Sequence, residues 1–240
     1  MRINTNVGAL TASRNAFVNN MATESSMRKL SSGLRISRAA DDAAGLAIAN
    51  NLRNQHRQLQ MGVNNAEQGS AMLQIAEGAA QTIERIIERK NELGIQQGSS
   101  QNTTASAVIT GEIAALDAEI TRIAGNTTFQ GTNVFGTQTF TVGDGSSVAV
   151  TVNALSASST LSDVNNVLAA IGAGQNRLEY TIQNTKSAVV NVKAAESTIR
   201  DVDMAEEMAN FTKNNILTQA AQAMLSQANQ GAQSVLQILR

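Results

Sequence analysis

The sequence predicts a mainly α-helical, elongated protein in which helices from the two ends of the chain pair as a coiled coil. Apolar residues recur in steps of three and four over most of the chain, which is the period of one helix face. The 240 residues include no proline and only 2% aromatic residues. Such a composition favours long uninterrupted helices in thin layers over a thick core. The predicted fold class is therefore an elongated helical rod with paired terminal helices and a small β-hairpin region.

The first predicted helix begins close to the N-terminus. Its apolar stripe alternates in steps of four and three, with one charged member, and comprises Ile3, Val7, Leu10, Arg14, Phe17 and Met21. Thr5 and Asn6 are alternative N-caps, because short polar side chains accept hydrogen bonds from the free N–H groups of a first turn. We expect the helix to continue to Leu30, since Ser31, Ser32 and Gly33 form a local breaker signal.

A longer second helix is predicted after Asp41 and Asp42, either of which suits its N-terminus. Its stripe is nearly unbroken and comprises Leu59, Val63, Ala66, Ser70, Leu73, Ala76, Ala80, Ile83 and Ile87. Gly62, Gly69 and Gly78 interrupt this pattern, and each glycine costs up to about 1 kcal/mol relative to alanine. We expect these glycines to allow other helices to approach closely.

The middle of the chain changes character after a third helical stripe, which comprises Ile109, Ile113, Leu116, Ile120 and Ile123. Residues 126–153 are rich in Gly, Asn and Thr, with alternating valines at 148, 150 and 152. Because Asp144–Gly145 is a hairpin-type turn pair, this region is predicted to be a β-hairpin. A short helix is expected over 161–171, and a final helical region from Gln175 to the chain end.

The last helix carries a second terminal stripe with the same rhythm as the first: Leu217, Ala221, Met224, Ala228, Gly231, Val235 and Ile238. We therefore predict that the two stripes face each other in an antiparallel coiled coil, with Ala228 and Gly231 as points of close approach. A two-helix layer buries one seam, which hardly offsets an ordering cost of about 1.5 kcal/mol per residue. We expect the pair to be marginal in a monomer and to order on assembly.

Several function classes are excluded by composition. The net charge is −1 and no basic patch interleaved with aromatic residues occurs, so nucleic-acid binding is not expected. No apolar run reaches the length of a membrane span, so no membrane insertion is expected. The first residues lack the apolar core of a secretory signal, so we expect any export to proceed without a cleaved signal peptide.

The sequence predicts no enzyme, cofactor or metal site. His56 is the single histidine, in a polar helical stretch, and zincin, nucleophile-elbow and phosphate-loop motifs are absent. The acidic pairs Asp41–Asp42 and Glu206–Glu207 fall where helices begin. Residues 84–92 fit a solvated helix face with ion pairs three residues apart. Two classes remain: a structural subunit whose helix faces are polymer interfaces, and a coiled-coil adaptor that binds a single partner.

Three long segments resemble bacterial flagellin, the subunit of the flagellar filament. They read MRINTNVGALTASRN, KLSSGLRISRAADDAAGLAIA and STIRDVDMAEEMANFTKNNILTQAAQAMLSQANQGAQSVLQILR. The resemblance covers about the first 135 and the last 65 residues, and hook-filament junction proteins are the nearest alternative. It implies a short form without outer variable domains. Residues 1–44 and 195–240 would form an inner coiled-coil domain, and residues 45–194 a helical rod domain whose hairpin lies at about 126–153.

The resemblance also implies partners and a mechanism. The subunit would leave the cell unfolded through the flagellar export channel, held beforehand by an export chaperone. It would then join a helical homopolymer for swimming motility, between the junction proteins and the filament cap. Ordering of both termini would drive assembly through one set of residues: Ile3, Val7, Leu10, Phe17, Met21, Leu217, Ala221, Met224, Ala228, Gly231, Val235, Leu236, Ile238 and Leu239.

An innate immune receptor of animals is a further partner that the resemblance implies. The positions that match the family's contact residues are Arg89, Glu92, Leu93, Gln96 and Glu112. Asn91, Gly94 and Leu116 depart from the residues usual in that segment, so weakened recognition is expected.

Overall fold

The structure is a computed structural model that describes residues 6–99, 106–143 and 145–238. By its contacts the chain divides into two units. The terminal unit comprises Met1–Arg53 with Ala194–Arg240, and the central unit comprises Asn54–Lys193. The described elements are α1 (Val7–Ser32), α2 (Ala43–Gln97), α3 (Ser106–Asn126), β1 (Thr128–Phe129), β2 (Thr132–Asn133), β3 (Gly136–Thr141), β4 (Ser147–Val152), α4 (Leu161–Arg200) and α5 (Met204–Ile238). The mainly α fold class is thus confirmed.

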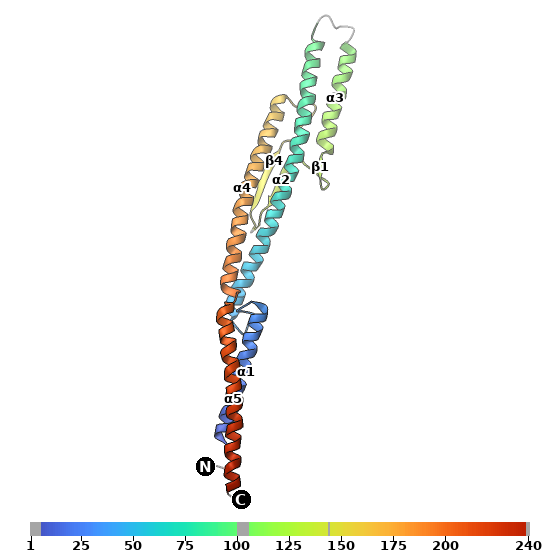
Figure 1. Cartoon of the computed structure of the whole chain (residues 1–240). Helices are drawn as coiled ribbons and strands as arrows, with labels where there is room; N and C mark the ends of the chain where they lie inside the picture. The colour runs from blue at the N-terminus through green and yellow to red at the C-terminus, as the bar shows by residue number, and fades with distance from the viewer. Residues whose placement is uncertain (1–5, 100–105, 144, 239–240) are drawn as a thin grey trace. The chain divides into compact units, whose positions relative to one another are not determined.

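In the terminal unit, α1 and α5 lie side by side and run in opposite directions (Figure 1). Asn6 is the N-cap of α1, because its side-chain oxygen accepts a hydrogen bond from the Ala9 N–H at 3.0 Å. Gly33 ends the helix with a φ of 68°, a left-handed conformation that glycine adopts without steric cost. The helix therefore spans the predicted range and ends at the predicted breaker.

Two connecting segments of the terminal unit bond to each other through their backbones. Leu34 and Asp201 form an antiparallel bridge. Next to it, the Arg35 N–H donates to the Arg200 carbonyl at 2.6 Å, and the Val202 N–H donates to the Gly33 carbonyl at 3.1 Å. These bonds hold the connection between α1 and α2 against the connection between α4 and α5.

The two neighbouring aspartates at the start of α2 have different tasks. Asp42 accepts a hydrogen bond from the Gly45 N–H at 2.9 Å and so occupies the capping position. Asp41 instead accepts from the backbone N–H groups of Arg38 and Ser37, at 3.0 and 3.1 Å. These bonds, first from Arg38 and then from Ser37, lower the pKa of the Asp41 carboxyl. The two aspartates thus stabilise the start of α2 and the segment before it.

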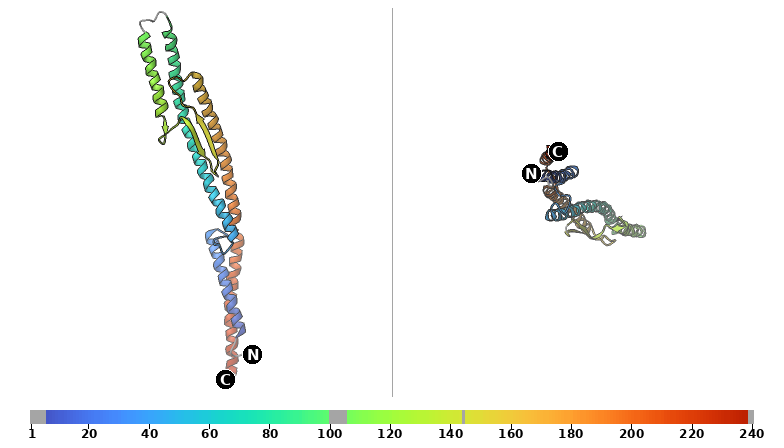
Figure 2. Two further views of the ribbon diagram at one scale, coloured as in Figure 1. Left: turned by 180° about the vertical axis from the view of Figure 1, so that it is seen from behind. Right: turned by 90° about the horizontal axis from the view of Figure 1, so that it is seen from below.

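In the central unit, the predicted stripe of α2 forms the core. Leu73, Ala76, Ala80 and Ile83 are completely buried, and Val63 and Ala66 nearly so. They pack with residues from α3, the β3–β4 hairpin and α4, among them Ile120, Val134, Val150, Val152, Val164, Ile171 and Leu178. Figure 2 shows the hairpin beside α2 and α4 from a second side.

The predicted β region is confirmed and holds two hairpins. β1 pairs with β2, and β3 pairs antiparallel with β4 in a register that runs from Gly136 opposite Val152 to Thr141 opposite Ser147. On β4 the predicted alternation is observed, with the valines buried and the residues between them exposed. The hairpin thus turns one face to the helices.

The predicted break between two helices at 171–175 is wrong, because α4 is continuous from Leu161 to Arg200. Gly172 and Gly174 lie inside the helix at this point. In the structure a Cβ at Gly174 would lie 2.6 Å from Val150. This glycine therefore allows strand β4 to approach α4 closely, and packing outweighs its weak helix propensity.

Lys90 occupies the next position of the α2 stripe after Ile87, where an apolar residue is expected. Its ammonium group lies 2.6 Å from Asp117 of α3 and donates to the Ala157 carbonyl at 2.7 Å. Both partners are half-buried. The Lys90 side chain therefore connects α2 to α3 and to the segment before α4, and the Asp117 carboxylate compensates its charge.

The start of α4 provides a pH-dependent contact. The Asp163 carboxylate accepts hydrogen bonds from the Thr160 N–H at 2.7 Å and from the Thr160 hydroxyl at 2.8 Å. These bonds lower the pKa of Asp163 below its ordinary value of 3.8. A depressed carboxyl pKa stabilises the folded state above the unfolded value, and this contribution disappears as the pH falls through the folded pKa.

We therefore expect Asp163→Ala to destabilise the helix start at neutral pH, and the effect to disappear only well below pH 3.8, as the pH falls through the lowered pKa of the folded carboxyl. Hydrogen exchange of the amides in the first turns of α4, compared between wild type and variant across this range, measures the difference. Glu88→Ala, which removes an exposed carboxylate inside α2, provides the comparison. A difference that persists unchanged in acid would contradict the assignment.

Candidate assembly surface

The contact between α1 and α5 is built mostly from small and polar side chains. The half-buried or buried positions that form the contact line of α1 are Ala9, Ala12, Ala16, Asn19, Thr23, Ser26 and Leu30, and Ala22, Ser25 and Lys29 are half-buried beside it. Those of α5 are Glu207, Phe211, Asn214, Thr218, Ala221, Leu225 and Ala228. Both sets alternate in steps of three and four, so each forms one line along its helix. Small residues let the backbones lie close but bury little apolar surface.

Polar contacts near each end of this seam set its register. The Asn6 side chain donates to the Ala228 carbonyl at 2.8 Å. Towards the other end, the Lys29 ammonium lies 3.6 Å from a carboxylate oxygen of Glu207, a residue that is only 8% exposed. Residues near the start of α1 thus meet residues near the end of α5, as an antiparallel pair requires.

The predicted apolar seam of α1 is wrong as an intrachain contact. Its described members are all exposed, at 63% for Val7, 68% for Leu10, 65% for Phe17 and 56% for Met21. With 3.6 residues per turn, these positions lie on the side of α1 opposite the small-residue seam. α1 thus carries two stripes with the same three-four spacing, and the stripe of smaller side chains faces α5. The large apolar residues are therefore left on an outward face.

The predicted stripe of α5 is partly confirmed. Ala221 and Ala228 lie on the seam, while Leu217 and Met224 are exposed beside it. Gly231 is exposed, and a Cβ there would meet no atom within 4 Å, so the predicted close approach is not found within the described chain. Ile3 and Leu239 lie outside the described residues, and Val235, Leu236 and Ile238 lie in α5 without described side chains.

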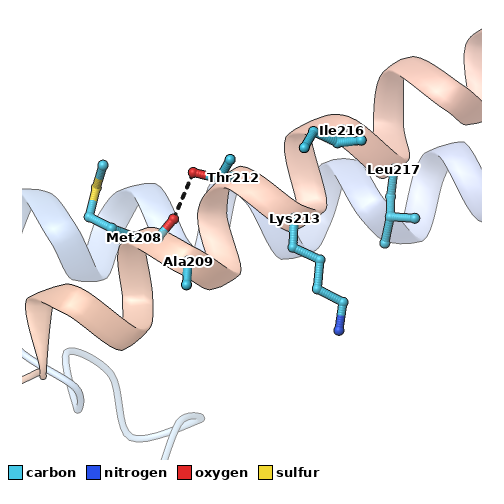
Figure 3. Close-up of a pocket in the computed structure, with 6 residues that line it drawn as sticks. All are labelled: Met208, Ala209, Thr212, Lys213, Ile216 and Leu217. Carbon is cyan, nitrogen blue, oxygen red and sulfur yellow. Dashed lines mark hydrogen bonds between the residues drawn. The ribbon is translucent and has the colours of Figure 1, made fainter.

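An open hollow of about 560 Å³ follows the outward side of α5 (Figure 3). Its six lining residues are Met208, Ala209, Thr212, Lys213, Ile216 and Leu217. The Thr212 hydroxyl donates to the Met208 carbonyl at 2.9 Å, so the hydroxyl is satisfied within the helix and the hollow stays largely apolar. The predicted stripe begins at Leu217 and therefore includes neither Met208 nor Ile216, although both are large apolar residues.

A second predicted surface lies on α2 and α3. The Arg89 guanidinium contacts Glu92 at 3.1 Å and Glu112 of α3 at 3.3 Å. Hydrogen bonds to Glu92 and then Glu112 raise the pKa of Arg89. The structure thus brings these three residues together on an exposed face, with Gln96 exposed further along α2. Leu93 is 1% exposed, so its prediction as a surface contact is wrong: it extends the buried stripe of α2.

Other candidate chemistry was sought within the described ranges. No group of three or more His, Cys, Asp or Glu side chains in 6–99, 106–143 and 145–238 is arranged to hold a metal ion. None of the helices described combines the length and apolar character that a membrane span requires. The exposed apolar residues of α1 and α5 are the remaining candidate surface within these ranges.

Two family models match the chain. The bacterial flagellin N-terminal helical region matches residues 3–139, and the bacterial flagellin C-terminal helical region matches residues 148–239. The chain belongs to the bacterial flagellins. Among curated flagellins, those of Bacillus subtilis (strain 168) and Halalkalibacterium halodurans are 40% and 41% identical to it. The flagellar filament 33 kDa core protein of Treponema phagedenis is 37% identical, and each of these alignments covers both chains completely.

As a flagellin, the protein is a structural subunit of the flagellar filament and acts in motility. The hook-filament junction protein and the single-partner adaptor are not favoured. The flagellin helical regions contain α1 and α5, so the outward apolar face belongs to a subunit that assembles with copies of itself.

Proposed function

We propose that this flagellin polymerises by covering the outward faces of α1 and α5 with neighbouring subunits. The observation that carries the proposal is the exposure of Val7, Leu10, Phe17 and Met21 on one side of α1. Contiguous apolar patches are uncommon on monomeric soluble proteins and mark interaction sites. Each large side chain that becomes fully buried contributes about 1.5–3 kcal/mol. A few such residues per subunit suffice to make assembly favourable.

The composition of the intrachain seam supports the same proposal. Apart from Leu30, Phe211 and Leu225, the seam consists of small or polar side chains that bury little apolar area, so α1 and α5 gain less from each other than large apolar side chains would provide. An isolated pair must still offset about 1.5 kcal/mol of ordering cost per residue. We infer that the terminal pair is marginal in a free subunit, and that the polymer supplies its stability.

Electron microscopy of the purified protein, after addition of short filament seeds, tests this function. Long filaments are the expected result. Short caps or persistent monomers would contradict it and favour a junction protein. A variant that separates the outward face from the rest of the fold is described in the Discussion.

The remaining partners are proposed from the family. The subunit is proposed to be a non-enzymatic, extracellular component that leaves through the export channel unfolded. A chaperone covers α5 beforehand, and the filament ends at cap and junction proteins. Residues 1–44 and 195–240 would line the tube, with 45–194 as the next shell. Isolation of a chaperone complex with the full chain, and its loss when residues 204–240 are removed, tests the first of these contacts.

A second proposal concerns the innate immune receptor, whose contact surface would be Arg89, Glu92, Gln96 and Glu112. The ion pairs hold the Arg89 side chain between α2 and α3. We expect Arg89→Glu to weaken binding of the receptor ectodomain by at least about tenfold, because it reverses the charge and repels Glu92 and Glu112.

Arg122→Glu is the matched control for this variant. Arg122 pairs with Glu119 three residues away and is exposed, so the substitution makes the same charge change in another i, i+3 pair. Binding measured by surface plasmon resonance should differ between the two variants. Equal loss for both would show a general charge effect and no specific surface.

A further inference from the structure

Sulfur in this protein occurs only as methionine. The sequence contains eight methionines, no cysteine and no tryptophan. Cysteine thiolates and methionine thioethers are the side chains that peroxides oxidise, and the thiolate is absent here. A mild peroxide therefore meets methionine as its principal target on this chain.

The methionines concentrate on the terminal pair. Five of the described ones lie on α1 or α5 and are about half exposed or more, and we call them the terminal methionines: Met21, Met27, Met204, Met208 and Met224. In the central unit, Met61 is exposed, whereas Met72 is 4% exposed and packs in the core. Met72 thus provides a buried methionine with which the oxidation of the exposed ones can be compared.

Three terminal methionines lie on the surfaces that assembly is proposed to cover. Met21 continues the outward face formed by Val7, Leu10 and Phe17. Met208 lines the hollow of α5, and Met224 lies one heptad after Leu217, which lines the same hollow. Met27 lines another open hollow of the terminal unit, together with Arg28 and Ser31. Flexible thioethers suit such contact surfaces because they adapt to an irregular partner.

We propose that the terminal methionines are a modification site for hydrogen peroxide, and that their oxidation in the free subunit blocks polymerisation. The inference rests on the proposed function of the outward faces. In the reaction, the sulfur lone pair attacks one peroxide oxygen, an S–O bond forms and the O–O bond breaks. The displaced hydroxide takes up the remaining proton and leaves as water. Sulfur loses two electrons and the peroxide gains them.

The sulfoxide changes the outward face in a way that assembly cannot accommodate. It converts a flexible apolar side chain into a polar one, and a polar group that is buried without a hydrogen bond is destabilising. Phe17 and Val18, one turn before Met21, are exposed and apolar and provide no donor. In the filament the proposed contacts cover the sulfur atoms of Met21, Met208 and Met224, so the reaction distinguishes free from assembled subunits.

The test treats the full-length free subunit with hydrogen peroxide, maps sulfoxides by mass spectrometry and measures polymerisation on seeds. We expect the terminal methionines to be oxidised well before Met72. The concentration required for assembly should rise at least about tenfold. Treatment with methionine sulfoxide reductases specific for both epimers should reverse the rise. Oxidised subunits that polymerise at the original concentration would overturn the proposal.

The decisive comparison replaces all five terminal methionines by leucine, which conserves volume and cannot form a sulfoxide. The readout is the ratio of assembly concentrations with and without peroxide, so a changed baseline does not matter. We expect a ratio near one for this variant, and the wild-type ratio for the matched Met61→Leu, Met72→Leu double variant. Inhibition by peroxide that remains in the five-leucine variant, or reductase treatment that fails to restore wild-type assembly, would overturn the proposal.

Failure of this inference is distinguishable from failure of the proposed function. If the Phe17→Asp variant polymerises normally, the outward face is not an assembly surface. If that variant is blocked while oxidised wild type assembles, the face is used but its methionines are not a peroxide-sensitive site.

Discussion

Phe17→Asp is expected to abolish filament formation while leaving the single subunit folded. Phe17 is 65% exposed in the subunit, so the substitution removes no intrachain core contact. In a filament the aspartate would be buried one turn after Arg14, the charged member of the same stripe, and removing its charge from water costs several kcal/mol even beside an opposite charge. The lost aromatic side chain removes about 1.5–3 kcal/mol more. Together these effects raise the assembly concentration by at least about a hundredfold, since every 1.4 kcal/mol is tenfold.

The measurement is seeded polymerisation followed by light scattering and electron microscopy. Phe17→Leu preserves an apolar side chain at the same position and should polymerise. Asn15→Asp adds the same charge at an exposed polar position of α1 and controls for charge alone. The helical circular dichroism of the free subunit should be the same in all three variants. Filaments of Phe17→Asp at wild-type concentrations would disprove the role of this face.

Gly62→Ala is expected to destabilise the central unit, and Gly78→Ala is expected to stabilise it. Both glycines lie inside α2, where alanine is favoured by up to about 1 kcal/mol. A Cβ at Gly62, however, would lie 2.3 Å from the Val142 backbone and 2.7 Å from the Gly143 nitrogen. A Cβ at Gly78 would meet no atom within 4 Å. Overpacking against backbone costs about 1–3 kcal/mol, which outweighs the propensity gain at Gly62.

Hydrogen exchange of the β3–β4 amides compares the two variants directly, because the backbone that Gly62 contacts lies in the turn of this hairpin. Protection should fall in Gly62→Ala and hold or rise in Gly78→Ala. Urea unfolding followed by circular dichroism gives the accompanying change in stability. An equal change in both variants would show that helix propensity alone decides, and that the close contact is unimportant.

The α2 stripe could be predicted from sequence because its three-four spacing continues over most of the helix, although Met61, Met72 and Ile75 are apolar residues off the stripe, of which Met72 is buried. The close approaches at Gly62 and Gly69 were also expected, but they are made to the hairpin: a Cβ at Gly69 would lie 2.8 Å from the Phe140 ring. Periodicity shows that a neighbour comes near and does not show which element it is. The continuity of α4 through Gly174 was missed for the same reason.

The predicted apolar stripe of α1 is exposed in the subunit, and only its assignment to the contact with α5 is wrong. On α1, a stripe of large apolar residues and a stripe of small residues share one rhythm, and spacing cannot tell which one meets α5. Large apolar residues are usually buried, so the larger stripe was expected to face α5. This expectation holds for a protein whose core is complete within one chain. Here the small residues pair, and Phe17 and Met21 face outward.

The bridge between Leu34 and Asp201 has a consequence for which substitutions the terminal unit tolerates. Its neighbouring bonds use backbone N–H groups of Arg35 and Val202, and every residue type except proline has such a group. These backbone bonds do not depend on which side chain stands at either position, whereas proline at either would delete a donor. Gly33, with its positive φ, is a position where a side chain itself is disfavoured. Arg35 adds a bond of its own, because its guanidinium donates to the Ile199 carbonyl at 2.7 Å. The junction therefore excludes proline at two positions, in a protein that contains none, and depends on side-chain identity at Gly33 and Arg35.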